Sequence, residues 1–259
     1  TVSLNIGAII SYKTNVKLDL IKTKATIEYD DSWGTPKPDN NLDQFNIEIN
    51  QQINEKANTK VNYINQNTQR RGDKYKLNTV SIINELELEQ SKLSVGISNT
   101  VDKDIANTKQ IKHTDFFSQW QGIINDNELS IGARVVDHDK FNRHYTYNLN
   151  WAKNLANDLR LTTSYGSATN LPDHYKNNLN IANNKTDLKP ERSNNFELGL
   201  QKSYTWGNFG TKVYKSKVSN AFKYEDPDNN SATDDAYYIN DGIVNIKGIE
   251  LNFDRELFG

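Results

Sequence analysis

The sequence contains no cysteine and no methionine among its 259 residues. Without cysteine there is no disulfide framework, no thiolate metal site and no cysteine nucleophile. A formal net charge of -2 provides no concentrated positive field, which argues against a nucleic-acid partner. No apolar run approaches the roughly 18 residues of a membrane-spanning helix. The start, TVSLNIGAII, has neither an initiating Met nor a basic signal-peptide region, so we expect a piece of a longer protein.

Apolar residues are also scarce. They make up 35% of the chain, below the roughly 45–50% of soluble globular domains, and the mean hydropathy is -0.81. Such values favour either disorder or an unusual core. The 4 Trp, 13 Tyr and 9 Phe residues argue against disorder. We therefore expect a chain that folds without an ordinary apolar interior.

The dominant pattern is an alternation of apolar and polar residues with a period of two. Leu129, Ile131, Ala133 and Val135 alternate with small or charged residues, as do the aromatic and aliphatic residues of 145–151. This is typical of strands with one apolar and one polar face. The same alternation recurs at 2–8, 45–49, 159–161 and 196–200. Helical spacing is nowhere sustained, so the sequence predicts an all-β fold.

The connections between these strands predict which all-β fold it is. Short turns near residues 13–15, 56–58, 90–92, 125–127, 155–158 and 206–208 alternate with longer polar segments at 30–42, 67–75, 101–113, 137–143, 166–194 and 222–236. A sandwich mixes loop lengths at both ends, whereas an up-and-down transmembrane β-barrel has short turns on one rim and long loops on the other. About thirteen antiparallel strands are expected. Bacterial barrels have even strand numbers, so we expect a partial arc of a larger barrel.

A membrane barrel also explains the composition, because its apolar face meets lipid and its inner face lines water or a polar plug. We therefore expect Leu129, Ile131, Leu149 and Leu198 on an outward apolar face, with Asn148 and Glu197 on the other. Aromatic residues near strand ends suit the interfacial girdles of such a barrel. The alternative is a soluble all-β binding module, which would place the apolar residues in a dry interior.

Four motifs in the last third of the chain carry a resemblance to a known family. They are the run Ser164–Pro172, the segment Asp187–Ser193 with Asn195–Gly199, the strand around Val213 with Val218–Tyr224, and Tyr237–Asn240 with Asn245–Glu250. In this order and spacing they resemble TonB-dependent outer-membrane receptors. The resemblance implies that residues 1–259 are part of the β-barrel domain, of the type with 22 strands. The plug domain, the TonB box and the terminal strands would lie outside this sequence.

The resemblance also implies a function. Such receptors are not enzymes; they capture a scarce nutrient with their extracellular loops, and TonB acts on the N-terminal region to drive import into the periplasm of a Gram-negative bacterium. The cobalamin receptors are the nearest match, because Tyr29–Asp39 resembles their aspartate-bearing, calcium-binding loop. Siderophore and haem receptors share the later motifs and stay open as alternatives, as does a passive porin. The expected partners are the nutrient, TonB, membrane lipid and lipopolysaccharide. The pair Arg70-Arg71 is most simply a charged rim, although such pairs can meet anionic lipopolysaccharide.

Candidate site residues fall into two groups. Calcium ligands are expected at Asp30, Asp31 and Asp39, since calcium takes six to eight oxygen ligands; the alternative is a solvated turn. Aromatic and amide groups that suit contact with a bulky ligand are Trp33, Asn170, Asp173, His174, Tyr175, Tyr237 and Tyr238. The acidic run 225–230 does not fit an EF-hand loop and is interpreted as a hydrated loop. Asp137-His138-Asp139 and His144 lack a serine in a nucleophile elbow, so no catalytic residues are expected.

Overall fold

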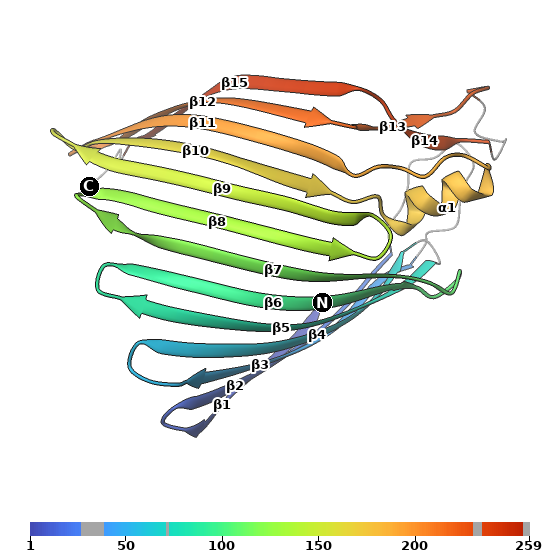
Figure 1. Ribbon diagram of the computed structural model, residues 1–259, viewed down its shortest axis with the longest axis horizontal. Helices are drawn as coiled ribbons and strands as arrows, with labels where there is room; N and C mark the ends of the chain where they lie inside the picture. Colours follow the sequence, from blue (N-terminus) through green and yellow to red (C-terminus); the bar gives the residue numbers. More distant parts are fainter. Residues whose placement is uncertain (27–38, 71–72, 230–234, 256–259) are drawn as a thin grey trace. The chain divides into compact units, whose positions relative to one another are not determined.

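The computed structural model describes residues 1–26, 39–70, 73–229 and 235–255. Its main element is an antiparallel sheet of 13 strands, in which each strand from β1 to β12 lies beside the next in sequence and β15 follows β12 (Figure 1). The strands β13 and β14 form a separate two-stranded sheet. The number of strands in the main sheet confirms the prediction. No helix in the described part of the chain is long and apolar enough to cross a membrane.

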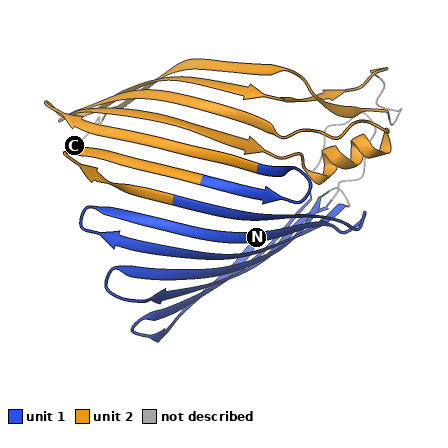
Figure 2. Cartoon of the chain, in the orientation of Figure 1, with its two compact units in different colours: residues 1–118, 134–143 blue, residues 119–133, 144–259 orange. Residues whose placement is uncertain are grey.

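The main sheet divides between two units (Figure 2). Unit 1 comprises residues 1–118 and 134–143, and unit 2 comprises residues 119–133 and 144–259. The strands are β1 (Val2–Ser11), β2 (Thr14–Thr26), β3 (Asp39–Gln52), β4 (Ala57–Arg70), β5 (Asp73–Leu88), β6 (Ser91–Asp104), β7 (Lys109–Ile124), β8 (Asn127–His138), β9 (Asn142–Leu155), β10 (Leu159–Asn170), β11 (Glu191–Tyr204), β12 (Gly207–Ser219), β13 (Phe222–Glu225), β14 (Tyr237–Asn240) and β15 (Ile243–Arg255).

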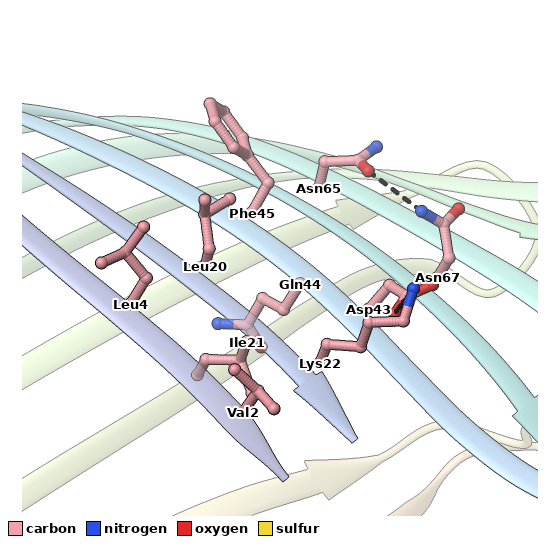
Figure 3. Close-up of a pocket in the computed structure, with 10 residues that line it drawn as sticks. All are labelled: Val2, Leu4, Leu20, Ile21, Lys22, Asp43, Gln44, Phe45, Asn65 and Asn67. Carbon is pink, nitrogen blue, oxygen red and sulfur yellow. Dashed lines mark hydrogen bonds and ion pairs between the residues drawn. The ribbon is translucent and has the colours of Figure 1, made fainter. Parts of the chain in front are cut away.

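In unit 1 the pairing registers align apolar residues across neighbouring strands on one face of the sheet. One such row runs Leu4, Leu20, Phe45 through β1, β2 and β3. Leu20 and Phe45 project from the same side of the sheet, where they line an open groove (Figure 3). The row continues into β4 with Asn65, whose amide donates to Asn78 at 2.5 Å. This row therefore changes from apolar residues in β1, β2 and β3 to paired amides in β4 and β5.

The other face of unit 1 is charged and hydrogen-bonded. Glu85 accepts from Lys60 at 2.9 Å and from Lys92 at 3.0 Å, which links β4, β5 and β6. Asn46 donates to Asp19 at 3.0 Å across β3 and β2. A sheet that pairs charges across one face and aligns exposed aliphatic rows on the other cannot bury the aliphatic rows by itself. The aliphatic face is stable only in contact with an apolar environment, such as the interior of a lipid bilayer.

Unit 2 repeats this division. Leu149, Leu198 and Ile131 are 45%, 41% and 51% exposed, as expected for an outward apolar face. On the opposite face Glu128 accepts two bonds of 2.6 Å from Arg160. Gly248 also faces this side, where a Cβ atom would lie 2.6 Å from the Tyr214 hydroxyl, so the glycine makes room for the tyrosine. The predicted separation into an apolar and a polar face is confirmed.

The tight turns follow from local residue preferences. The two residues between β7 and β8, Asn125 and Asp126, both have positive φ angles, 48° and 61°. A type I′ turn needs this conformation at both central residues, and Asn and Asp tolerate it better than other non-glycine residues. The two-residue turn therefore fixes the pairing register of β7 and β8, and with it which side chains of the two strands share a face of the sheet.

Several connections differ from the prediction. The sequence predicts long loops at three places, 67–75, 101–113 and 137–143. In the structure β4 ends at Arg70 and β5 begins at Asp73. The other two connections are short turns, of four residues at 105–108 and of three residues at 139–141. Polar residues of the three predicted loops occupy strand positions, because a strand with a wet face accommodates polar residues along its whole length. The sequence also predicts a single last strand over residues 237–257, but β14 ends at Asn240 and belongs to the small sheet, and β15 begins at Ile243.

Candidate ligand-binding site

Two long loops of unit 2 fold into small structures of their own. The loop between β10 and β11 contains the helix α1 (His174–Ala182), and the loop between β12 and β15 contains the hairpin of β13 and β14. The sequence shows no sustained helical spacing, and α1 is a short helix within a chain that is otherwise built from strands. Figure 1 shows α1 and the hairpin at the same end of the sheet. We call α1 together with this hairpin the loop platform.

Buried asparagines join the two parts of the loop platform. Asn180 is 3% exposed, donates to the carbonyl of Tyr238 at 2.8 Å and accepts from the Tyr238 amide at 2.8 Å. It also donates to the Thr186 carbonyl at 3.0 Å. Asn183 donates to the carbonyl of Ala236 at 2.8 Å. The asparagine side chain thus pairs with β14 as another strand would, which fixes the helix against the hairpin.

The beginning of α1 is set by Asp173. Its Oδ1 atom accepts from the Lys176 amide at 2.8 Å, which satisfies one of the helix's free backbone donors. Its Oδ2 atom lies 2.5 Å from the Lys176 ammonium. The predicted ligand residue Asp173 therefore has a structural role as the N-cap, and it also positions a lysine.

The motif residues that carried the family resemblance hold the platform on the main sheet. Glu191 accepts from the Phe222 amide at 2.6 Å and from the Asn170 side chain at 2.6 Å. Asn240, the last residue of the Tyr237–Asn240 motif, exchanges two bonds of 2.8 Å with the backbone of Lys189. It donates a third to the Asn220 carbonyl at 2.8 Å. The motifs are thus explained by loop positioning rather than by ligand contact.

Three tyrosines from both parts of the platform form an aromatic cluster. The ring of Tyr238 lies 5.4 Å from that of Tyr224 and 6.5 Å from that of Tyr175, both in edge-on arrangements. Tyr175 and Tyr224 are 53% and 52% exposed. The Lys176 ammonium lies 5.4 Å from the Tyr238 ring centre. We call Tyr175, Tyr224, Tyr238 and Lys176 the tyrosine cluster; it offers exposed ring faces, hydroxyl groups and one positive charge.

A second cation and aromatic pair lies on the same platform, where the Lys185 ammonium is 4.1 Å from the Tyr237 ring centre. The hairpin itself carries shifted ionisation equilibria. A hydrogen bond to Glu225, and a second to Asp241, raise the pKa of Lys223 above its ordinary value. Burial raises the pKa of the Tyr224 hydroxyl, and the charge of Asp226 raises it further. Both groups therefore keep their neutral-pH protonation states in the folded hairpin.

The hairpin loop also brings carboxylates together. One oxygen from each of Asp226, Asp228 and Asp235 lies within 4.8 Å of the others. This spacing would suit a hard cation such as calcium, which prefers carboxylate oxygens. The sequence predicts a hydrated loop for the acidic run 225–230, because the run does not fit an EF-hand loop. The linear sequence does not show that Asp235 lies beside Asp226.

The platform, with the N-cap of α1, unites five of the seven predicted ligand residues: Asp173, His174, Tyr175, Tyr237 and Tyr238. Asn170 lies at the end of β10, bonded to Glu191, and His174 is buried, with 6% of its surface exposed. Asp39 begins β3 and accepts from Thr26 at 3.1 Å. Trp33, Asp30 and Asp31 lie outside the described residues. Every one of these ligand assignments stays a prediction.

Sequence reasoning did not identify Lys176, Lys185 or Tyr224 as parts of the site, nor Asn180 as its central support. A signal for the support was present. Asn177, Asn180 and Asn183 are spaced by three, which places them along one side of a helix. Three amides on one helical face predict a polar contact, although the sequence does not show that β14 is the partner.

Comparison with known proteins identifies the fold family. Residues 5–259 match the family model described as TonB dependent receptor-like, beta-barrel. The chain belongs to the TonB-dependent receptor family. Members of this family are β-barrel transport receptors of the Gram-negative outer membrane, and they are not enzymes. In this TonB-dependent receptor chain, the apolar face of the sheet therefore meets lipid, and the long loops belong to the extracellular rim.

Individual relatives share only parts of their length with this receptor chain. The vitamin B12 transporter BtuB of Photobacterium profundum is 25% identical over 129 residues, which are 49% of this chain and 21% of that protein. The siderophore receptor PirA of Pseudomonas aeruginosa is 15% identical with a TM-score of 0.76, over 99% of this chain and 53% of that one. The FrpB iron transporter of Neisseria meningitidis is 13% identical with a TM-score of 0.68, over 99% and 49%.

These structural similarities show the fold alone, because the identities are low. The chain spans about half the length of the solved receptors that it resembles. The prediction that a plug domain and further strands belong to the whole protein stays a prediction.

Proposed function

We propose that the protein to which this chain belongs binds a scarce nutrient at its extracellular loops and imports it into the periplasm with energy supplied through TonB. Membership of the receptor family supports the transport function. The observation that carries the binding step is the tyrosine cluster, which is exposed and mounted on two loops that buried asparagines hold together. A rigid aromatic surface with few rotatable bonds loses little entropy when a bulky ligand binds.

We propose cobalamin as the ligand. The similarity to a vitamin B12 transporter, which extends over 129 residues, supports this choice, as does the resemblance of Tyr29–Asp39 to a calcium-binding loop. Calcium bound by Asp30, Asp31 and Asp39 belongs to the same proposal. Cobalamin presents a broad, largely apolar ring system with amide side chains, which suits tyrosine rings and hydroxyl groups.

A ferric siderophore is the second candidate, and a different feature favours it. Lys176 and Lys185 each lie beside an aromatic ring, so the platform offers positive charge next to flat apolar surface. An anionic ligand with aromatic groups would use both. A passive porin and a haem receptor are further alternatives, and neither is favoured by a specific contact.

Calorimetry on the full-length receptor tests these proposals. We expect cyanocobalamin to bind in the presence of calcium and to bind more weakly after chelation. Tyr238→Ala should weaken binding about tenfold, the usual effect of removing a central aromatic contact. Tyr204→Ala is the matched control, because Tyr204 is an exposed tyrosine that lies at the tight-turn end of β11.

Each alternative predicts another outcome. If the receptor binds a ferric siderophore tightly and does not bind cobalamin, the siderophore is the ligand in place of cobalamin. In that case Lys176→Gln should weaken siderophore binding more than Tyr238→Ala does. Swelling of liposomes in small sugars, through the intact full-length protein, would favour a porin. Uptake that persists in cells without TonB would refute active transport.

A further inference from the structure

The turn between β8 and β9 is closed by a histidine. The Nδ1 atom of His138 accepts from the backbone amides of Lys140 and Phe141 at 3.0 and 3.1 Å. Only 1% of the His138 side chain is exposed, and the Phe141 ring packs against it with 4.8 Å between the ring centres. The turn lies at the opposite end of β8 from the tight turn at 125–126, which places it on the extracellular rim of this receptor chain.

The nitrogen atom that accepts these two bonds cannot carry a proton. In neutral histidine one ring nitrogen donates and the other accepts, whereas both nitrogens donate in the charged form. A proton on Nδ1 would point at two N–H groups, so both bonds to the turn would be lost. The closed turn therefore requires neutral His138 with its proton on Nε2.

A carboxylate beside the turn offers the charged form of His138 a different partner. The Oδ1 atom of Asp139 lies 3.4 Å from His138 Nδ1. Its Oδ2 atom accepts from the Lys112 amide at 2.9 Å, which holds the carboxylate on β7. A positive charge also lies nearby, because the Lys140 ammonium is 5.4 Å from the centre of the Phe141 ring. Protonated Nδ1 can thus donate to Asp139 once it has released the two amides.

The neighbouring strand β7 contributes a second histidine. The ring of His113 stacks on that of His138, with centres 5.8 Å apart and an angle of 9° between the planes. His113 Nε2 lies 3.6 Å from Asp115, which Arg134 also binds at 3.0 Å. Two stacked rings that both carry a positive charge repel each other. Acid therefore favours movement of His138 out of the stack.

Two other turns of unit 1 have the same cap with a different acceptor. Asp104 accepts from the amides of residues 106 and 107 at 3.1 and 3.2 Å, and Asn54 accepts from those of residues 56 and 57, both at 2.9 Å. An aspartate becomes protonated only near about pH 4, and an asparagine does not titrate. Among these three acceptors, histidine is the one that changes its charge between about pH 5 and 8.

We propose that the 139–141 turn is an acid-sensitive switch on the extracellular rim, closed when His138 is neutral and open when His138 is protonated. In the open state Nδ1 donates to Asp139, the amides of Lys140 and Phe141 bond to water, and the Phe141 ring loses its contact with the imidazole. The proton is the ligand of this site, and the turn has two arrangements that the proton selects between.

The direction of the effect follows from proton counting. The closed turn binds fewer protons than the open turn, so low pH favours the open form. The cap stabilises the turn fully above the ordinary pKa of histidine, about 6.5, and this stabilisation is lost as the pH falls below that value. The equilibrium constant for opening should then rise about tenfold per pH unit, or about thirtyfold between pH 7.5 and pH 5.0.

Hydrogen exchange on the full-length receptor in detergent tests the switch. Protection factors, in which the pH dependence of the exchange chemistry cancels, are compared at pH 7.5 and pH 5.0. We expect the protection of the Lys140 and Phe141 amides to fall about thirtyfold at the lower pH. The amides of residues 106 and 107 are the control within the same molecule and should keep their protection, since their acceptor is a carboxylate.

Variants separate the titration of His138 from a general loss of stability. His138→Asn should keep the turn closed at both pH values, because asparagine caps the turn at Asn54 in the same way. Asp139→Asn should reduce the acid effect about threefold, since the open state loses an ion pair. Unchanged protection at Lys140 and Phe141, an equal loss at residues 106 and 107, or an acid effect that persists in His138→Asn would overturn the proposal. The comparison of the two turns in the unmodified receptor needs no variant to fold.

Discussion

Replacement of Asn180 by alanine should release α1 from the hairpin of β13 and β14. The change removes three hydrogen bonds, to the Tyr238 amide, the Tyr238 carbonyl and the Thr186 carbonyl. Each buried group left without a partner costs about 1–3 kcal/mol. Water can enter part of the opened contact, so we expect the low end of the sum of the three costs. The free energy needed to open the loop platform locally should therefore fall by about 3 kcal/mol.

Hydrogen exchange on the full-length receptor measures this opening. A loss of about 3 kcal/mol corresponds to roughly a hundredfold faster exchange at the Tyr238 amide. Amides in β10 and β11 should keep their protection, since the main sheet is unchanged. Ile181→Ala, an exposed position on the same helix, is the control and should have little effect. Unchanged protection of Tyr238 in the Asn180 variant would refute the claim that this side chain joins the loops.

Three further outcomes are expected. Gly248→Ala should lower the free energy of unfolding by about 1–3 kcal/mol, because its Cβ would collide with the Tyr214 ring; Tyr214→Ala in the same chain should recover part of the loss in thermal denaturation. Arg160→Ala should lower it by about 1 kcal/mol or less by the same assay, since the ion pair is partly exposed. The hydrogen bonds that raise the pKa of Lys223 stabilise the hairpin fully at pH values below 10.5, the ordinary pKa of a lysine. This stabilisation is lost as the pH rises through the higher pKa that Lys223 has in the folded hairpin. Cleavage by an alkaline protease should therefore increase above pH 10.5, with no such step in Lys223→Gln.

The alternation of residue types was enough to predict the strands and their two faces. In a sheet, neighbouring side chains point to opposite faces, so a period of two is determined locally and survives in every strand. The low apolar content was enough to indicate that the second face is wet. The tight turn at Asn125 and Asp126 is equally local, because it depends on the conformations that these two residues tolerate.

The loops could not be predicted in the same way. Polar residues near Arg70, Asp104 and His138 look like loop residues, but they continue strands, because cross-strand hydrogen bonds satisfy the backbone whatever the side chains prefer. The helix α1 has little apolar periodicity; its stability comes from asparagines that bond to β14 and the residue before it, which lie more than fifty residues away in sequence. Local propensity carries no information about that contact.

The amino-acid sequence by itself determined that this protein is a sheet with one apolar face and one polar face, since the alternation of side chains follows from the geometry of the strand backbone. Only the tertiary structure decided which side chains become neighbours: Tyr175 with Tyr238, Asp226 with Asp235, and Lys215 with Lys247. Each of these contacts depends on strand register or loop packing. Both are set by many distant residues together, and no single stretch of the chain encodes them.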